Sequence, residues 1–485
     1  MATIKAVTCP VCGCLCDDIE LTVQDGKIVE VKNGCAMSES KFLGFREHRI
    51  TKPLMRKDGK LVETSFKEAT EKAAEILVNA NYPLLYGWSS TSCEATRIGL
   101  ELAEEIGAVI DNTSTVCHGP SELGVQDVGI ASCTLGQVRH RADLVVYWGS
   151  NPWSAHPRHI ERYTSFADGR FEGSEWKGYL VKSKAASAKK KVERALRVAY
   201  PREESTQSPS DLRKEPFPAL LKKGRKLVVV DVRKTRSADI ADYFIQVEPN
   251  RDYELLQAFR ALIRDEGLDV DEVAGVPVEY LEEVADVMVN CNFGVIFFGL
   301  GLTMSSGKLR NVDAALSLAR DLNQRTKFAI MPMRGHFNVS GADTVFTWQT
   351  GYPYAVDFSR GYPRYNPGET SAVDVLLRKE SDAALIVASD PVSNLPREAA
   401  EHLAKNPLIV IDPHLNATGL MADVVFPSTF VGIEAEGTAY RMDHVPLPLK
   451  KVVNPPKGLL SDEQILSRIL LRIRKIKAEP KMEGS

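Results

Sequence analysis

The stretch ADLVVYWGSNP (142–152) runs through an unbroken apolar segment and then stops at a glycine, a serine and an asparagine. Other stretches share this pattern of a β-rich apolar run that ends abruptly at small or polar residues. They are YPLLYGWSS (82–90), KLVVVDVRKT (226–235), FGVIFFGLGL (293–302), AALIVASDP (383–391) and PLIVIDP (407–413). Continuous apolar runs are typical of strands buried on both faces, as in a parallel sheet.

Stretches with helical periodicity lie between these runs, for example ATEKAAEILVNA (69–80) and NVDAALSLARDLNQ (311–324). The alternation predicts doubly wound α/β domains, in which ligands bind beyond the carboxyl ends of the strands. The usual nucleotide loops are missing, however. The segment from Gly301 to Lys308 is one residue too long for a Walker A loop, and Gly299 and Gly301 are followed by Met304 where a dinucleotide loop needs glycine.

Length and composition indicate a multidomain globular protein. The 485 residues are 44% hydrophobic and 26% charged, which is ordinary for such proteins. A formal net charge of −3 argues against a nucleic-acid-binding surface over the whole molecule. The N-terminus MATIKAVTCPVCGC resembles no export signal, and no apolar run approaches the roughly 20 residues that span a bilayer. We therefore expect a cytoplasmic protein that binds neither nucleic acid nor membrane.

Five of the nine cysteines lie before residue 36, in CPVCGCLC (9–16) and at Cys35. In the cytoplasm such thiols indicate metal or redox sites more than disulfides. Closely spaced thiolates followed by a distant one suit an iron–sulfur cluster with four ligands, whereas structural zinc sites usually have two Cys pairs. The iron–sulfur site is therefore favoured over zinc. Spacing alone leaves Cys14 and Cys16 as equal candidates, and DDIELTVQDGKIVEVKNG (17–34) predicts a hairpin that brings Cys35 back to the others.

Two segments differ from the α/β pattern. Residues 171–225 are polar, charged and rich in serine and proline, and they predict a partly disordered surface insertion. A basic RNA-binding arm is the alternative, but the mixed charges favour a solvated insertion. Near the end, SDEQILSRILLRIRKIK (461–477) predicts an amphipathic helix capped at Ser461.

An ordered series of short motifs resembles the molybdopterin oxidoreductases. After the cysteine cluster come GSNP (149–152), DVRKT (231–235), SDP (389–391) and MADVVFPST (421–429), which look like the successive pterin-dinucleotide loops of that superfamily. Each motif alone is weak, but the ordered set is specific. Formate dehydrogenases share a Cys-His pair at the metal and an RGxxNVxG segment, which here are Cys117-His118 and MRGHFNVSG with Arg334.

The closer resemblance is to the B subunits of the tungsten- or molybdenum-containing formylmethanofuran dehydrogenases. It rests on the long segment beginning PMRGHFNVSGADTVFTWQTGYPYAVDF (332–358) and on EAEGTAYRMDHVP (434–446). The resemblance implies reduction of CO2 to formate, which a partner subunit condenses with methanofuran. Two features depart from the family. The insertion is longer than expected, and the chain stops where formate dehydrogenases continue with a cap domain.

The resemblance also implies which residues form the site. Cys9, Cys12, Cys16 and Cys35 would hold a 4Fe–4S cluster, with Cys14 as the spare thiol. Cys117 would bind tungsten or molybdenum together with two pyranopterin guanine dinucleotides, with His118 and Arg334 as catalytic partners. Candidate contacts to the dinucleotides are Ser89, Asn112, Gly149, Ser150, Asn151, Asp231, Arg233, Lys234, Thr235, Gly299, Gly301, Ser389, Asp390, Asp412 and Asp423. Without the resemblance, His118 would be interpreted as a buried hydrogen-bonding residue and Arg334 as a structural ion pair.

The implied organisation has three parts. Residues 1–57, completed by 434–475, form an iron–sulfur domain; residues 58–117 with 334–433 form one α/β dinucleotide domain; and 118–333 form a second. The implied partners are an amidohydrolase-like formyl-transferring subunit, a small cap subunit over the pterin site, and ferredoxin-like or polyferredoxin electron carriers. A formate dehydrogenase, a non-redox scaffold subunit and a metal-free α/β binding protein are the alternatives. A scaffold has no reason to keep Cys9, Cys12, Cys16, Cys35 and Cys117 together.

Overall fold

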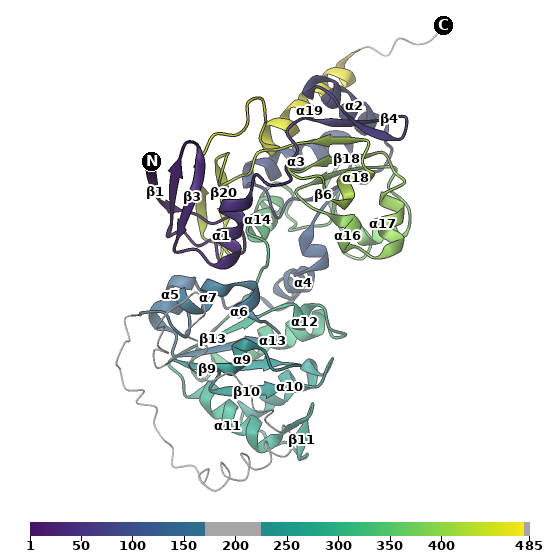
Figure 1. Cartoon of the computed structure of the whole chain (residues 1–485). Coiled ribbons are helices and arrows are strands. Elements are labelled where there is room, and N and C mark those ends of the chain that lie inside the picture. Colours follow the sequence, from purple (N-terminus) through teal and green to yellow (C-terminus); the bar gives the residue numbers. More distant parts are fainter. Residues whose placement is uncertain (170–224, 480–485) are drawn as a thin grey trace. The chain divides into compact units, whose positions relative to one another are not determined.

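The computed structural model describes residues 1–169 and 225–479, and it divides into two compact units (Figure 1). Unit 1 contains Met1–Gly119 and Arg334–Ser485, and unit 2 contains Pro120–Met333. Each unit has its own sheet with a parallel core. The further division of unit 1 into an iron–sulfur domain and an α/β domain stays a prediction.

Unit 2 is built on a five-stranded sheet in which every neighbouring pair is parallel. Its spatial order is β10 (Tyr243–Gln246), β9 (Lys226–Asp231), β8 (Leu144–Trp148), β13 (Phe293–Phe298) and β14 (Lys327–Pro332). The central strand β8 is the apolar run of 142–152, and all its residues are buried. The prediction of parallel strands buried on both faces is therefore confirmed for this sheet.

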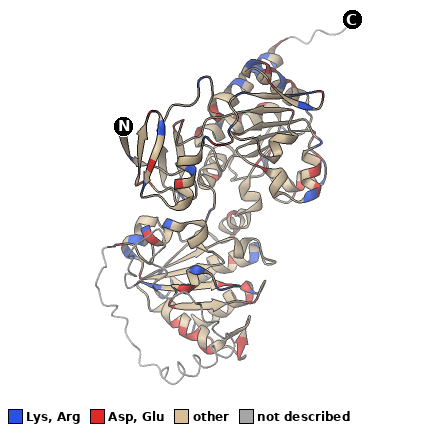
Figure 2. Cartoon of the chain, viewed as in Figure 1, with Lys and Arg blue, Asp and Glu red and all other residues tan. Residues whose placement is uncertain are grey.

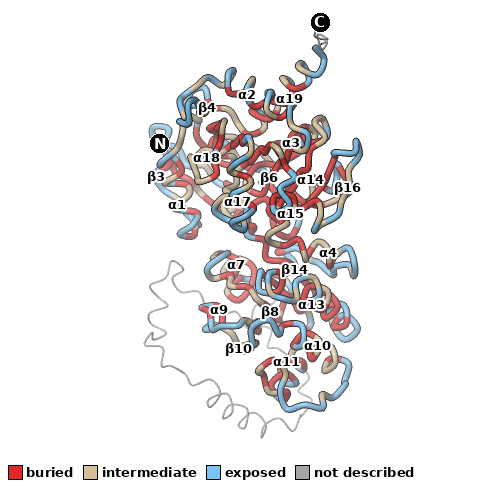
Figure 3. The backbone as a smooth tube through the Cα atoms, turned by 90° about the vertical axis from the view of Figure 1, so that its right-hand side faces the viewer, coloured by how far each residue is buried: buried red, intermediate tan, exposed pale blue. Residues whose placement is uncertain are grey.

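Helices cover the two faces of the unit 2 sheet because alternate strand residues point to opposite sides. Val146 and Trp148 pack in one core with α10 (Asp252–Leu262), α11 (Val278–Val289) and α13 (Leu309–Leu322). On the other face, the Tyr147 hydroxyl lies 2.8 Å from Nδ1 of His159 in α7 (Pro157–Arg162). Figure 3 shows these strands as buried and the outer helix faces as exposed.

Unit 1 contains a nine-stranded sheet with a parallel centre and antiparallel edges. Its order is β16 (Arg364–Tyr365), β15 (Val356–Asp357), β7 (Val109–Asn112), β6 (Pro83–Gly87), β17 (Ala383–Val387), β18 (Leu408–Ile411), β19 (Val424–Phe426), β4 (Leu54–Lys57) and β5 (Lys60–Glu63). Leu385 faces one core and Ile386 the other. The first core includes α2 (Phe66–Asn79), α3 (Cys93–Ile106), α14 (Val339–Thr350) and α19 (Asp462–Ala478), and the second includes α15 (Ala372–Leu377) and α17 (Arg397–Leu403).

The cysteine-rich N-terminus forms a small antiparallel sheet of β1 (Ala2–Val7), β2 (Ile19–Gln24) and β3 (Lys27–Lys32), followed by α1 (Ala36–Gly44). The predicted hairpin is confirmed. Asp25 and Gly26 both adopt positive φ, 51° and 72°, as a two-residue turn between twisted strands requires. The hairpin returns the chain to Cys35, the N-cap residue of α1.

The predicted C-terminal helix is also confirmed. Ser461 and Gln464 form a capping box at the start of α19. Its apolar residues join the core with α2 and α3. Its basic residues, which Figure 2 colours blue, pair with acidic ones on α3. Arg474 Nη2 lies 2.8 Å from Glu101 Oε1, and Lys477 Nζ lies 2.9 Å from Glu105 Oε1.

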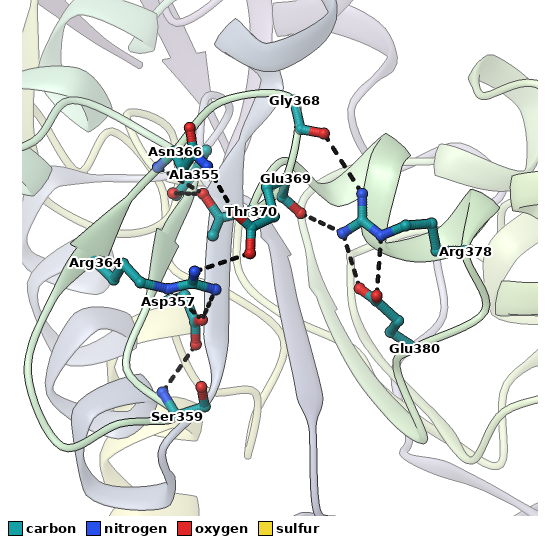
Figure 4. Close-up of polar contacts among 10 residues, drawn as sticks. All are labelled: Ala355, Asp357, Ser359, Arg364, Asn366, Gly368, Glu369, Thr370, Arg378 and Glu380. Atoms are coloured by element: carbon teal, nitrogen blue, oxygen red, sulfur yellow. Dashed lines mark hydrogen bonds and ion pairs between the residues drawn. The ribbon is translucent and has the colours of Figure 1, made fainter.

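A polar network fixes the segment between β15 and β17 (Figure 4). Arg364 pairs with Asp357 and Glu369, each at 2.8 Å, and Arg378 pairs with Glu380 at 2.8 Å. Beneath the network, the buried carboxylate of Asp111 accepts hydrogen bonds from the backbone N–H groups of Ala355 and Ala372. The carboxyl end of β7 is thereby tied to this segment.

The predicted insertion lies outside the described residues, apart from its last residue. Arg225 is buried, and its guanidinium donates to the carbonyl oxygens of Arg139, Ala142, Thr164 and Ala167. Of the helices that the structure describes, none is both long and apolar enough to cross a membrane.

The remaining described elements are short connections and hairpins. They are the 3-10 helix η1 (Thr113–Val116), α4 (Gly119–Val128), α5 (Leu135–Arg141), α6 (Pro152–Ala155), α9 (Arg236–Asp239), β11 (Glu272–Val273), β12 (Val276–Pro277), α12 (Leu300–Thr303), α16 (Pro391–Asn394), α18 (Ala417–Met421), β20 (Gly437–Tyr440) and β21 (Pro446–Leu449).

Candidate functional site

Cys117 lies one short turn beyond the carboxyl end of β7. The Asn112 side chain accepts a hydrogen bond from the Ser114 backbone N–H at 2.8 Å, which caps η1. The backbone N–H of Cys117 then donates to the Ser114 carbonyl at 3.0 Å and closes the turn. The Cys117 side chain stays partly exposed, whereas the next residue, His118, is fully buried.

Arg334 and Asp343 form a buried ion pair beside this turn. Arg334 Nη1 lies 2.5 Å from Asp343 Oδ2, and both side chains are almost inaccessible to solvent. The other carboxylate oxygen of Asp343 accepts from the Ser114 hydroxyl at 2.8 Å and from Asn112 Nδ2 at 3.1 Å. Asp343 therefore joins α14 to the turn that carries Cys117, and it fixes the position of the Arg334 guanidinium.

The surroundings of Cys117 shift the pKa of its thiol in opposing directions. Burial raises its pKa to about 11, and the negative charge of Asp343 adds to this rise. The Arg334 cation and a hydrogen bond from the Gly335 backbone lower the pKa. Binding of a metal requires the thiolate, so the arginine provides the positive charge that this form needs.

Cys12, Cys16 and Cys35 lie close enough to Cys9 for their charges to act on its thiol. Cys9, Cys14, Cys16 and Cys35 are buried, and Cys12 is partly exposed. Burial raises the pKa of Cys9 well above its usual value, and the neighbouring charges of Cys16, Cys12 and Cys35 raise it further. Within residues 1–169 and 225–479, no three His, Cys, Asp or Glu side chains gather around a single point as ligands of one metal ion.

The cysteine loop packs directly against the segment that carries Arg334. The Gly13 backbone N–H donates to the Gly335 carbonyl at 3.1 Å, and Cys12 pairs with His336 in an isolated β-bridge. A Cβ atom on Gly13 would collide with the Arg334 carbonyl oxygen. This approach is possible only for glycine, because real Cβ atoms do not come so close to backbone oxygen.

Most predicted cofactor contacts of unit 1 collect at one edge of its sheet. Asn112 ends β7, and Ser89, Ser389 and Asp412 follow β6, β17 and β18. All four lie at the carboxyl ends of adjacent parallel strands. Asp390 also lies here, and its Oδ1 accepts from the Thr418 backbone N–H and hydroxyl at 2.9 and 2.6 Å.

Asp423 does not belong to this edge. It directly precedes β19, and its Oδ2 accepts from the backbone N–H of Leu408, the first residue of β18, at 2.9 Å. Both positions are at the amino ends of their strands, opposite the edge that carries Asp412. The Asp423 carboxylate therefore joins two strands, and we correct its assignment from cofactor contact to structural residue.

The predicted contacts of unit 2 also follow its strands, although two of them serve the packing. Ser150 and Asn151 follow β8, Asp231 ends β9, and Arg233, Lys234 and Thr235 come after it. A Cβ on Gly301 would lie 2.5 Å from Gly149 Cα, and one on Gly299 would lie 2.5 Å from the Gly149 carbonyl oxygen. Gly299 and Gly301 are thus needed for contact between two loops.

Sequence reasoning missed Asp343, although the segment that contains it was part of the resemblance. The only indication in the sequence was an acidic residue nine positions after Arg334. It lies in a helix whose other buried residues are apolar or have small side chains. Such a signal does not separate a buried partner from a solvent-exposed residue. The structure adds Asp343 to the set around Cys117.

The chain matches the profile of the molybdopterin oxidoreductase family over residues 49–172 and 212–472. It is 46% identical to the B subunit of the tungsten-containing formylmethanofuran dehydrogenase 2 of Methanocaldococcus jannaschii, over 98% of this chain and 99% of that protein. The equivalent protein of Methanococcus maripaludis is 43% identical over 98% of this chain and 100% of its own length.

Among solved structures, a chain of the formyltransferase/hydrolase complex from Methylorubrum extorquens, determined with methylofuran, has a similar fold. Its TM-score is 0.62 at 21% sequence identity, over 88% of this chain and 99% of that one. At this identity the likeness shows the fold alone.

Proposed function

Because the chain belongs to the molybdopterin oxidoreductase family, and within it to the B subunits of formylmethanofuran dehydrogenases, we propose that it interconverts CO2 and formate at a tungsten or molybdenum centre. It is an oxidoreductase subunit of a multisubunit enzyme. The formate would pass to a partner subunit that condenses it with methanofuran. This chain would therefore carry the redox half of the reaction.

One observation carries the proposal: a cysteine, an arginine and the carboxylate that orients the arginine lie together at the carboxyl edge of the unit 1 sheet. Cys117 provides a soft sulfur ligand suited to tungsten or molybdenum. Arg334 is buried and held by Asp343, so its cationic fork can bind the two oxygens of a carboxylate. A structural ion pair alone would not need to lie beside a thiol.

Reduction of CO2 to formate consumes two electrons and one proton, and the metal centre supplies the two-electron chemistry when it is bound. The protein's side chains serve the remaining needs. Arg334 binds the negative charge that develops on the carboxylate oxygens, in a buried site where electrostatic interactions are strong. His118, which is fully buried and follows Cys117 in the chain, would hold or transfer the proton.

We further propose a 4Fe–4S cluster on Cys9, Cys12, Cys16 and Cys35. Each thiolate of such a cluster binds its own iron, so the sulfur atoms surround a common centre and do not converge on one ion. The charges of Cys12, Cys16 and Cys35 act on the Cys9 thiol, and four neighbouring thiolates of this kind support the proposal. The edge contacts of the two sheets support one pyranopterin guanine dinucleotide for each unit.

The partner subunits follow from the same proposal. An amidohydrolase-like subunit would receive the formate, a small subunit would cover the pterin site, and ferredoxin-like or polyferredoxin subunits would deliver electrons.

The non-redox scaffold is the remaining alternative, since a chain of a formyltransferase/hydrolase complex shares the fold. The retention of Cys117 with the four cluster cysteines argues for the redox subunit.

Elemental and pterin analysis of the native complex tests the proposed function. We expect tungsten or molybdenum at about one atom per chain, together with iron, two guanine dinucleotides and oxidation of formate with an artificial acceptor. A complex that transfers formyl groups but contains neither metal nor pterin would establish the scaffold alternative.

The cluster assignment predicts different results for two neighbouring cysteines. Cys12→Ala should lower the iron content and abolish the cluster signal in electron paramagnetic resonance, because a ligand is lost. Cys14→Ala should retain four iron atoms per chain, because Cys14 is the spare thiol. Both variants remove one sulfur from the same loop, so each is the matched control for the other. Equal iron loss in both would show that the ligand set is wrong.

A further inference from the structure

Asp111 is a buried carboxylate at the carboxyl end of β7 that takes no part in the proposed chemistry. Its side chain is inaccessible to solvent, and it directly precedes Asn112, the residue that caps η1. Its cross-strand neighbour on β6 is Tyr86, which is also buried. After burial, the charges of Asp111 and of Cys117 both raise the pKa of the Tyr86 hydroxyl. Asp111 and Cys117 therefore lie close to the same side chain.

Donors from three segments of the chain bind the Asp111 carboxylate. Its Oδ1 accepts from the backbone N–H groups of Asn112 at 2.8 Å and Ala355 at 3.0 Å. Its Oδ2 accepts from the Ala372 N–H at 2.7 Å, and the Thr115 side chain donates a further hydrogen bond. Burial raises the pKa of this carboxyl to about 7, although these hydrogen bonds act in the opposite direction. A buried carboxylate needs such donors.

The η1 turn depends on outside contacts of this kind for its position. A 3-10 helix of four residues makes few hydrogen bonds of its own, and their geometry is poorer than in an α-helix. Asp343 binds the turn through the Ser114 hydroxyl, and Asp111 binds it through Thr115. Cys117 directly follows the turn. The two carboxylates therefore fix the place of its thiol.

The two carboxylates act on different parts of the site. Asp343 also pairs with Arg334, so it couples the cysteine to the arginine. Asp111 instead ties η1 to Ala355 and Ala372, which lie in and beside the segment whose ion pairs Figure 4 draws. Loss of the Asp111 contacts should therefore move the cysteine and leave the arginine in place.

We propose that Asp111 is a positioning residue for the metal ligand, because it holds the turn that presents the Cys117 thiol. The inference rests on the proposed function, since the metal does. Groups that orient a metal ligand typically change metal affinity or activity about 10- to 100-fold when they are removed. In the complete complex, Thr115→Val should lower kcat for formate about 10-fold. It should leave KM unchanged, because Arg334 keeps its contact with Asp343.

The direct test is alkylation of the cysteines in the full-length chain prepared without cofactor, followed by mass spectrometry. Thr115→Val should speed the labelling of Cys117 by iodoacetamide about 5- to 10-fold, because the turn opens more easily when one hydrogen bond is lost. Asp111→Asn should speed it more. Cys93, a buried thiol in the same unit, is the internal reference, and its labelling should not change.

Thr96→Val is the matched control. It makes the same substitution in α3, where the Thr96 hydroxyl donates to the Ser92 carbonyl oxygen, and it should change the labelling of Cys117 by less than about twofold. If Asp111→Asn also exposes Cys93, that variant has unfolded, and Thr115→Val decides the outcome. Unchanged labelling of Cys117 in Thr115→Val, or an equal rise at Cys93, would overturn the inference. The proposed function is judged separately, by metal content and turnover of the wild-type complex.

Discussion

Replacing Cys117 by serine is expected to abolish the interconversion of CO2 and formate while leaving the iron content of the complex unchanged. The hydroxyl is a poor ligand for a metal that prefers soft sulfur, so tungsten or molybdenum should be lost or inactive. Cys117 lies on the turn after β7, whereas the cluster cysteines belong to the N-terminal loop and the start of α1. The two thiol sites should therefore respond independently.

Cys133→Ser is the matched control, because Cys133 is also a partly exposed thiol but lies in unit 2. It should retain turnover, metal and iron. The measurements are formate oxidation, elemental analysis and the cluster signal in electron paramagnetic resonance. Full turnover by Cys117→Ser would remove this residue from the metal site.

Arg334→Lys is expected to lower kcat/KM for formate by about 100- to 1,000-fold, the range for loss of a preorganised group that stabilises developing charge. Lysine keeps the charge but lacks the planar fork that binds both carboxylate oxygens. It also cannot reproduce the contact with Asp343 in the same geometry. KM should rise along with the fall in kcat, because formate binds through the same group.

Asp343→Asn should lower kcat/KM by about 10-fold, since it acts only by positioning Arg334. The effect should be smaller than that of Arg334→Lys, and the double variant should be little worse than Arg334→Lys alone. Asp357→Asn, which breaks the comparable Arg364–Asp357 pair of the network in Figure 4, should leave turnover unchanged. Additive losses in the double variant would mean that Asp343 does not act through Arg334.

The sequence was most informative for buried strands and for residues that belong to a family motif. The buried strands could be predicted because unbroken apolar runs have few alternatives, and β8 in the middle of its sheet is the clearest case. The cysteines and Arg334 could be named because the family motifs mark them. Asp423 was assigned to the wrong edge of the sheet. It comes after a short helix, whereas Asp412 comes after a strand, and the amino-acid sequence around them does not distinguish the two edges.

Residues whose role depends on a distant partner could not be predicted. Asp343 accepts a hydrogen bond from Asn112, which lies more than 200 positions before it in the sequence. The glycines at 299 and 301 were assigned to a ligand, because a glycine required by another loop has the same appearance in a sequence as one required by a cofactor. Only the contact with Gly149 separates the two roles.

The contact of Gly13 with the Arg334 carbonyl couples the positions of two loops. The cysteine loop and the arginine segment touch there through backbone atoms, so neither has a side chain at this point that could be exchanged to absorb a shift in the other. Any insertion, deletion or substitution at Gly13 would displace both loops at once. A substitution at Gly13 should therefore change the cysteine loop and the position of Arg334 together.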